Sequence, residues 1–190
     1  MKKYSCLADQ IHALGDYSIR PVQNEEINQI RLWRNEQIEV LRQDKLINKS
    51  MQIDYFKRKI WPQYKKDKPE QILLSIYKNK IFIGYGGLVY INWDNLSAEV
   101  SFLLCTERMG KHELYSKDFK SFLTLIKYLA TKELNLNYLT SETYVFRKKH
   151  IEILENASFE AYGVKENTLS MQNKKYDSIL HKCNLQANTK

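Results

Sequence analysis

The stretch from Gln71 to Cys105, QILLSIYKNKIFIGYGGLVYINWDNLSAEVSFLLC, decides the fold of this chain. It contains three short apolar runs rich in β-branched residues, and short runs of this kind are typical of strands. Two polar segments, Lys78–Lys80 and Asn92–Asn95, separate the runs, and asparagine tolerates the left-handed backbone that tight turns require. Because short turns join antiparallel neighbours, the sequence predicts a three-stranded antiparallel meander. The expected strands cover residues 72–77, 81–91 and 98–105.

Helix and strand patterns continue on both sides of this meander. Before it, a short strand at Tyr17–Pro21 precedes a helix that Asn24 can cap, and a second helix spans residues 51–65. After it come a charged loop at 106–117, an apolar-striped helix at 118–134, a strand at 137–146, a helix at 147–156, and strands that begin near 159 and 175. This order predicts one α/β (α+β) domain, in which helices flank a mixed, mostly antiparallel sheet. We expect the domain to cover residues 17–184, between an N-terminal extension, 1–16, and a C-terminal tail, 185–190.

Length and composition are those of an ordinary globular protein. The chain has 190 residues, of which 43% are hydrophobic, and this suits one domain with one core. No apolar run approaches the roughly 20 residues that cross a bilayer. The cysteines, Cys6, Cys105 and Cys183, are odd in number and far apart, and they and the histidines show no metal-ligand spacing. We therefore expect a cytoplasmic protein with no membrane association, no disulfide framework and no metal.

The net charge of +8 raises the question of a polyanionic partner. Only seven of the 30 basic residues are arginine, and the others are lysine. A lysine-rich excess of this kind is most simply a solvated surface. Binding of an anionic small ligand is the next interpretation, and nucleic acid binding is the least favoured.

Three segments carry a resemblance to a known family. They are the strand AEVSFLL at Ala98–Leu104, the helix end KELNLN at Lys132–Asn137, and the helix KHIEILENASF at Lys149–Phe159. Together with the element order, this pattern resembles the GCN5-related N-acetyltransferase (GNAT) superfamily over roughly Tyr17–Cys183. The resemblance implies the acyl-CoA N-acyltransferase fold and an enzyme that transfers an acetyl group from acetyl-CoA, as co-substrate, to an amine.

Two features depart from the family pattern. The phosphate-binding loop of the family usually reads Arg/Gln-x-x-Gly-x-Gly/Ala before a helix, whereas Arg108–Glu113 keeps one glycine and is expected to be about five residues longer. The family often carries, in the helix at 147–156, a tyrosine that protonates the departing thiolate, and Leu154 occupies that position here. The resemblance, with the excess of positive charge near the loop and the helix start, implies a set of residues that contact coenzyme A. These are Leu103, Leu104, Cys105, Arg108, Gly110, Lys111, Lys117, Arg147 and Lys148.

Three residues are candidates for the acid and base chemistry of acetyl transfer. Strand alternation puts Glu99 on the opposite face from Val100, Phe102 and Leu104, where it can act as a general base or position the substrate. Tyr144 and His150 can replace the missing tyrosine as hydrogen-bond or proton donors. The alternatives are a solvent-facing carboxylate for Glu99, a packing role for Tyr144 and a surface position for His150.

The acceptor is predicted from the segment Leu32-Trp33-Arg34-Asn35. It is similar to the Trp-Arg-Asn signature of enzymes that acetylate nucleotide-linked amino sugars or ribosomal-protein N-termini. We expect Trp33, Arg34 and Asn35 to border the acceptor site; the alternative is a core anchor for Trp33 and a helix-surface ion pair for Arg34. The run Gly84–Gly87, which contains Tyr85 and Gly86, is interpreted first as structural, and otherwise as the floor of the acceptor site. The leading hypothesis is a nucleotide-linked amino sugar of surface polysaccharide biosynthesis. The alternatives are a protein or peptide N-terminus, or a non-catalytic domain that binds coenzyme A or nucleic acid, and the oligomeric state stays open, with a homodimer as one option.

Overall fold

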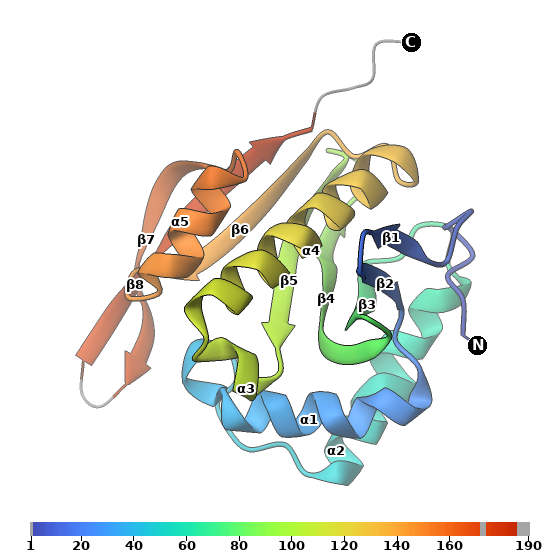
Figure 1. Cartoon of the computed structure of the whole chain (residues 1–190), viewed down its shortest axis with the longest axis horizontal. Helices are drawn as coiled ribbons and strands as arrows, with labels where there is room; N and C mark the ends of the chain where they lie inside the picture. The colour runs from blue at the N-terminus through green and yellow to red at the C-terminus, as the bar shows by residue number, and fades with distance from the viewer. Residues whose placement is uncertain (1, 172–173, 186–190) are drawn as a thin grey trace.

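The computed structural model describes residues 2–171 and 174–185. Its strands form one eight-stranded sheet in the order β1-β2-β3-β4-β5-β6-β8-β7, shown in Figure 1. Every strand pair is antiparallel except β5 with β6, so the prediction of a mixed, mostly antiparallel sheet is confirmed. The strands are β1 (His12–Leu14), β2 (Tyr17–Pro21), β3 (Ile72–Lys78), β4 (Ile81–Asn92), β5 (Ser97–Leu104), β6 (Tyr138–Tyr144), β7 (Glu160–Met171) and β8 (Lys174–Asn184).

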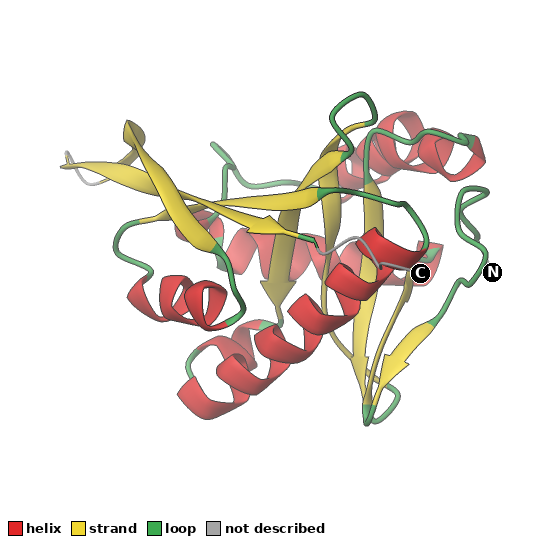
Figure 2. Ribbon diagram, turned by 90° about the horizontal axis from the view of Figure 1, so that it is seen from above, coloured by secondary structure: helices red, strands yellow, loops and turns green. Residues whose placement is uncertain are grey.

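Helices cover both faces of this sheet. Figure 2 shows helices on both sides of the sheet. The α-helices are α1 (Ile27–Glu36), α2 (Lys49–Tyr55), α3 (Thr106–Met109), α4 (His112–Lys132) and α5 (Lys148–Asn156). Short 3₁₀ or π turns are η1 (Asn24–Glu26), η2 (Ile38–Val40), η3 (Phe56–Ile60) and η4 (Trp61–Lys65). In the part of the chain that is described, no helix has the length and apolar character needed to span a membrane.

The central meander of β3, β4 and β5 is present as predicted, and the turn between β3 and β4 has the expected backbone conformation. Asn79 and Lys80 have positive φ angles of 50° and 66° between β3 and β4, the conformation that the polar turn was expected to supply. A Cβ atom on Gly86 of β4 would collide with the carbonyl oxygen of Ser101 on β5. The glycines of β4 therefore allow two backbones to approach closely, which is a structural role.

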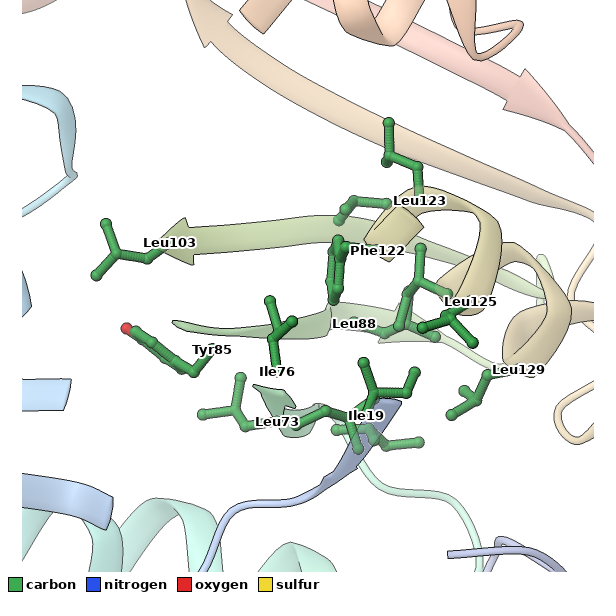
Figure 3. Packing of buried hydrophobic residues seen from close by; sticks show 14 of the residues in the cluster. Ile19, Leu73, Ile76, Tyr85, Leu88, Leu103, Phe122, Leu123, Leu125 and Leu129 are labelled. Atoms are coloured by element: carbon green, nitrogen blue, oxygen red, sulfur yellow. The ribbon is translucent and has the colours of Figure 1, made fainter. Parts of the chain in front are cut away.

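The hydrophobic core lies between α4 and the sheet. Phe122, Leu125 and Leu129 of α4 pack with side chains from β2, β3 and β4, as Figure 3 shows. Phe102 of β5 also faces α4, because its ring stacks on Phe119 at a centroid distance of 4.3 Å. Strand alternation then turns the neighbouring odd-numbered residues of β5 toward the side of α1 and α2.

The sheet has a short seam between β5 and β6. The two parallel strands pair only over Ser97–Glu99 and Tyr138–Thr140, although β5 continues to Leu104 and β6 to Tyr144. Beyond Glu99 the strands diverge, and Figure 1 shows the gap between their ribbons. This divergence positions the candidate site.

Three parts of the chain differ from expectation. Within the expected extension 1–16, β1 adds a strand to the sheet, and Tyr4 is buried in the core, where it stacks on Tyr64. The charged segment 106–117 is a one-turn helix followed directly by the start of α4, so the expectation of a longer loop is wrong. The helix starts early because Asp118, which is fully buried, anchors Arg108 and accepts a hydrogen bond from the hydroxyl of Tyr17. Residues 186–190 of the expected tail lie outside the described residues.

Candidate active site

A cavity of about 880 Å³ lies at the seam where β5 and β6 separate. Because the strands no longer pair beyond Glu99, the cavity extends to both faces of the sheet. Glu99, Glu142 and Arg42 line it on the side of α1 and α2, whereas Phe119 and His150 line it on the side of α4 and α5. A molecule in this cavity can therefore contact groups on both faces at once.

One end of the cavity holds a pair of carboxylates around a single guanidinium. Nη2 of Arg42 lies 3.0 Å from Oε1 of Glu99 and 3.1 Å from Oε2 of Glu142, and Nζ of Lys165 lies 3.6 Å from that second carboxylate. Burial raises the pKa of Glu99, Arg42 lowers it and Glu142 raises it, so that the net shift is upward. A carboxylate with a raised pKa is suited to accept a proton near neutral pH.

The other end of the cavity holds a neutral imidazole. His150 is buried, and its ring stacks on Phe119 at a centroid distance of 4.2 Å. Nδ1 of His150 lies 2.6 Å from the hydroxyl of Tyr115. The oxygen of this hydroxyl also accepts a hydrogen bond from Nη2 of Arg147, at 3.1 Å. Burial, with Arg147 and His181 nearby, holds the pKa of His150 well below its usual value. The imidazole is therefore uncharged at neutral pH and can offer one N–H group.

Tyr144, the second candidate donor, lies beside the cavity but does not line it among the described residues. Its side chain is buried and stacks on Phe146. Burial raises the pKa of Tyr144, and the charges of Arg42, Glu142 and Arg147 also act on it. Leu154 is fully buried in the core. The structure thus brings Glu99 and His150 to one cavity and leaves Tyr144 outside it.

The expected coenzyme A segment follows β5 directly. Gly110 precedes α4 by two residues, and a Cβ atom there would meet no protein atom within 4 Å. Since the first N–H groups of a helix have no partner within the helix, the start of α4 can receive phosphate oxygens. Lys111 and Lys117 are exposed on this side. Arg108, in contrast, is bound to Asp118: its Nε lies 2.5 Å from Oδ2 and its Nη2 lies 2.9 Å from Oδ1 of that carboxylate.

The remaining residues expected to contact coenzyme A are partly buried and partly exposed. Leu103, Leu104 and Cys105 have buried side chains. The carbonyl oxygen of Leu104 accepts a hydrogen bond from Gln37, and the N–H of Cys105 donates to the carbonyl oxygen of Ile83. Lys148 is exposed at the start of α5, and its neighbour Lys149 forms an ion pair with Glu152 at 3.0 Å. The positive charge of Lys149 is unfavourable beside the positive end of the helix dipole, and the ion pair with Glu152 offsets it.

The expected acceptor segment is mostly structural. Trp33 is buried against Phe82, and Asn35 holds the backbone of Ile47 through two hydrogen bonds, of 2.8 and 2.9 Å. Arg34 lines the cavity, but it donates to the hydroxyl of Tyr85 at 2.7 Å and to Gln43 at 3.0 Å. These contacts leave Trp33 no open ring face and engage Nε and Nη1 of Arg34.

Two residues that line the cavity, Arg42 and Glu142, and one that contacts its lining, Tyr115, carried no signal in the sequence. Arg42 and Glu142 reach Glu99 from the segment after η2 and from β6, which are far apart along the chain. Tyr115 lies in the segment that was expected to be a loop. In the described part of the chain, no group of three or more His, Cys, Asp or Glu side chains is arranged to hold a metal ion.

Comparisons with known proteins extend this description. A family model described as "Acetyltransferase (GNAT) domain" matches residues 19–180. The structure is similar to that of spermidine N-acetyltransferase from Vibrio cholerae in complex with CoA and spermine, with a TM-score of 0.77, 15% sequence identity, and coverage of 92% of this chain and 98% of that chain. It is also similar to a dodecameric structure of spermidine N-acetyltransferase from the same organism in an intermediate state, with a TM-score of 0.74, 15% identity, and coverage of 90% and 95%. No curated protein matches the sequence at a significant level.

Proposed function

The chain belongs to the GNAT acetyltransferase family and is an acetyl-CoA-dependent N-acetyltransferase. On that premise, we propose that its acceptor is a primary amine on a molecule that carries at least one further positive charge, such as a linear polyamine. The observation that carries this proposal is the pair of carboxylates, Glu99 and Glu142, around the guanidinium of Arg42. Carboxylates that line a cavity can pair with the ammonium groups of a cationic ligand. Lys165, 3.6 Å from Glu142, offsets part of their charge here.

The cavity supplies the groups that the reaction needs. Glu99, directly or through a water molecule, takes a proton from the acceptor ammonium, because only the uncharged amine attacks the thioester carbonyl. The new C–N bond forms, negative charge develops on the carbonyl oxygen, and the C–S bond then breaks. The thiolate needs little help, since a thiol with a pKa of about 8.5 leaves as a tolerable anion. His150 donates its N–H to the developing charge.

Coenzyme A is proposed to lie along the gap between β5 and β6. Beyond Glu99, β5 pairs with β4 alone among the described strands, so the backbone groups on its other edge can bind the pantetheine chain. The start of α4 after Gly110 would hold the pyrophosphate, with Lys111, Lys117 and Lys148 nearby to balance its charge. Arg147 would contribute donors that Tyr115 does not use.

A nucleotide-linked amino sugar, the acceptor expected from the sequence, has less support. Stacking of its base or sugar would need an open aromatic face, whereas Trp33 is buried, and two of the three nitrogens of Arg34 are engaged with Tyr85 and Gln43. The polyamine acceptor named for the Vibrio cholerae structure accords with the carboxylates of this cavity, although at 15% identity the likeness supports the fold and not the substrate.

The test is an acceptor panel with acetyl-CoA, in which release of the CoA thiol is measured. The panel contains spermidine, a monoamine of similar length, a UDP-linked amino sugar and a peptide with a free N-terminus. We expect saturable turnover with spermidine and a higher KM for the monoamine. Turnover of the nucleotide sugar or the peptide alone would overturn the proposed acceptor class.

Replacing Arg42 by Gln is expected to move the acid limb of the kcat/KM profile to higher pH. Glu99 must be ionised to act as a base, so activity falls as pH drops through its pKa. Loss of Arg42 raises that pKa further, because the contact that lowers it is removed and Lys165 alone then balances Glu142. The profile is measured with one acceptor for both proteins, so that titration of the amine is common to both. Arg58→Gln, at an exposed residue of η3, is the matched control. An unmoved acid limb would contradict the role of Glu99.

Replacing Gly110 by Ala is expected to raise KM for acetyl-CoA by about 10-fold, which corresponds to about 1.4 kcal/mol of lost binding. The fold has room for the methyl group, so the melting temperature should not change. Steady-state kinetics and thermal unfolding measure the two effects. Gly163→Ala in β7, where the nearest atom to a Cβ is 3.8 Å away, is the control. An unchanged KM would show that phosphates do not approach Gly110.

A further inference from the structure

Tyr115 of α4 joins two residues that line the cavity, Arg147 and His150. Its side chain is 5% exposed, and its hydroxyl group is the point where the two hydrogen bonds meet. No motif in the sequence points to it. Its position behind the imidazole, away from the acceptor subsite, suggests an effect on His150 and not on the substrate.

The direction of the two hydrogen bonds follows from what each group can donate. A guanidinium has donors only, so the oxygen of Tyr115 accepts the bond from Arg147. Burial raises the pKa of Tyr115, and the hydroxyl therefore keeps its proton. Within hydrogen-bond distance of the hydroxyl among the described residues, the group that can accept this proton is Nδ1 of His150. Tyr115 is thus the donor and Nδ1 the acceptor.

An imidazole whose Nδ1 accepts a hydrogen bond must carry its proton on Nε2 when it is neutral. We propose that Tyr115, oriented by Arg147, is a positioning residue that fixes His150 as the Nε2–H tautomer and so directs its single N–H group toward the reacting acyl group. Stacking of the ring on Phe119 holds the plane of the imidazole. This inference rests on the proposed function of His150 as a donor.

The fixed tautomer decides which chemistry His150 performs. A neutral Nε2–H group donates a hydrogen bond to the oxyanion or to the departing sulfur, and it does not transfer its proton, because an imidazolate would result. The proton balance then closes elsewhere: Glu99 takes one proton from the acceptor ammonium and releases it to solvent, and it takes the second proton from the nitrogen once the C–N bond has formed. The thiolate takes a proton from solvent after it leaves. Leu154 is compatible with this scheme, because no proton donor is required at its position.

The first test is a long-range ¹H–¹⁵N NMR spectrum of the protein with ¹⁵N-labelled histidine. The chain has four histidines, and the signal of His150 is assigned by its loss in His150→Phe. We expect a single neutral Nε2–H pattern in the unmodified protein that persists across neutral pH. In Tyr115→Phe we expect a mixture of the two neutral tautomers. An Nδ1–H pattern in the unmodified protein, or an unchanged pattern in Tyr115→Phe, would overturn the proposal.

The second test separates positioning from packing by kinetics. Tyr115→Phe keeps the ring, so we expect KM for acetyl-CoA to stay unchanged while kcat falls roughly 10- to 100-fold, a loss typical when the partner that orients a histidine is removed. Tyr128→Phe, at an exposed tyrosine of the same helix, is the matched control. If Tyr115→Phe does not fold, Arg147→Met, which removes the donor to the Tyr115 oxygen, should also mix the tautomers, and a single tautomer there would count against the proposal.

The two tests distinguish failure of this inference from failure of the proposed function. If the NMR spectrum shows a mixed tautomer while the enzyme acetylates spermidine, the inference about Tyr115 is wrong and the acceptor class stands. If the tautomer is fixed but His150→Phe keeps full kcat, the donor role of His150 is wrong, and with it the catalytic consequence that we assign to Tyr115.

Discussion

Replacing Glu99 with Gln is expected to lower kcat for amine acetylation by roughly 100-fold or more, the range typical for loss of a general base. Glutamine keeps the shape of the side chain and its contact with Arg42, but it cannot take up a proton. The structure supports the base role because Glu99 is 23% exposed in its side chain, lies at the end of the β5–β6 pairing and has a raised pKa. Single-turnover rates at saturating acceptor measure the effect directly.

The control for this change is Glu70→Gln. Glu70 also lines the cavity, but it is exposed and forms an ion pair with Lys66 at 2.8 Å, away from the seam. We expect its replacement to alter acceptor KM at most and to leave kcat near that of the unmodified enzyme. Equal losses in both variants would show that general negative charge, and not proton transfer at Glu99, supports the rate.

Replacing His150 with Phe is expected to lower kcat by roughly 100-fold, as removal of one preorganised donor to an oxyanion does in other acyl-transfer enzymes. The phenyl ring can keep the stacking on Phe119, whereas the N–H group is lost. The Tyr115 hydroxyl loses its acceptor, which should cost about 1–3 kcal/mol of stability. Stopped-flow release of the CoA thiol and thermal unfolding measure the two effects separately.

A partial rescue separates the donor from the ring. His150→Gln restores an N–H donor without the aromatic stacking, and we expect its kcat to lie between those of the unmodified enzyme and His150→Phe. If His150→Gln is as slow as His150→Phe while both remain folded, the ring itself and not its N–H is what the reaction uses.

Much of the fold could be predicted because local signals agreed with one another. The meander of β3, β4 and β5 follows from apolar runs that end at polar turns, and Asn79 and Lys80 adopt the positive φ that those turns need. Residues 2–16 gave no such signal, because they have no regular period. Tyr4 is held in the core by contacts with residues far away in sequence: its hydroxyl accepts a hydrogen bond from the backbone N–H of Leu73, and its ring stacks on Tyr64.

The start of α4 shows how charge can hide a helix. The segment 106–117 was expected to be a loop because of its many charged side chains, but Tyr115, Asp118 and Phe119 recur at helical spacing and all point inward. Asp118 would be expected on the surface from the sequence, and its burial is explained by the bidentate contact with Arg108 and the hydrogen bond from Tyr17. Pairing between distant residues is what sequence patterns do not reveal.

The same limit applies to the candidate site. Glu99 could be found because strand alternation alone separates it from Val100 and Phe102, and the structure brings it and His150 to one cavity. Arg42 could not be found, since its partners, Glu99 and Glu142, are 57 and 100 residues away in sequence. The three-residue match at Trp33 to Asn35 suggested an acceptor site, yet the burial of Trp33 and the hydrogen bonds of Asn35 to Ile47 show that these two residues hold the scaffold.

The seam between β5 and β6 makes the catalytic cavity also a joint between two parts of the sheet. The backbone ladder that connects β1–β5 with β6–β8 has three residue pairs, so the two parts are held together mainly by side chains from α4 and α5. An acyl-CoA in the gap would contact both parts, and its binding free energy would then oppose their separation. The loaded enzyme should therefore resist heating and proteolysis as one unit, whereas the empty enzyme should begin to open where its substrates enter.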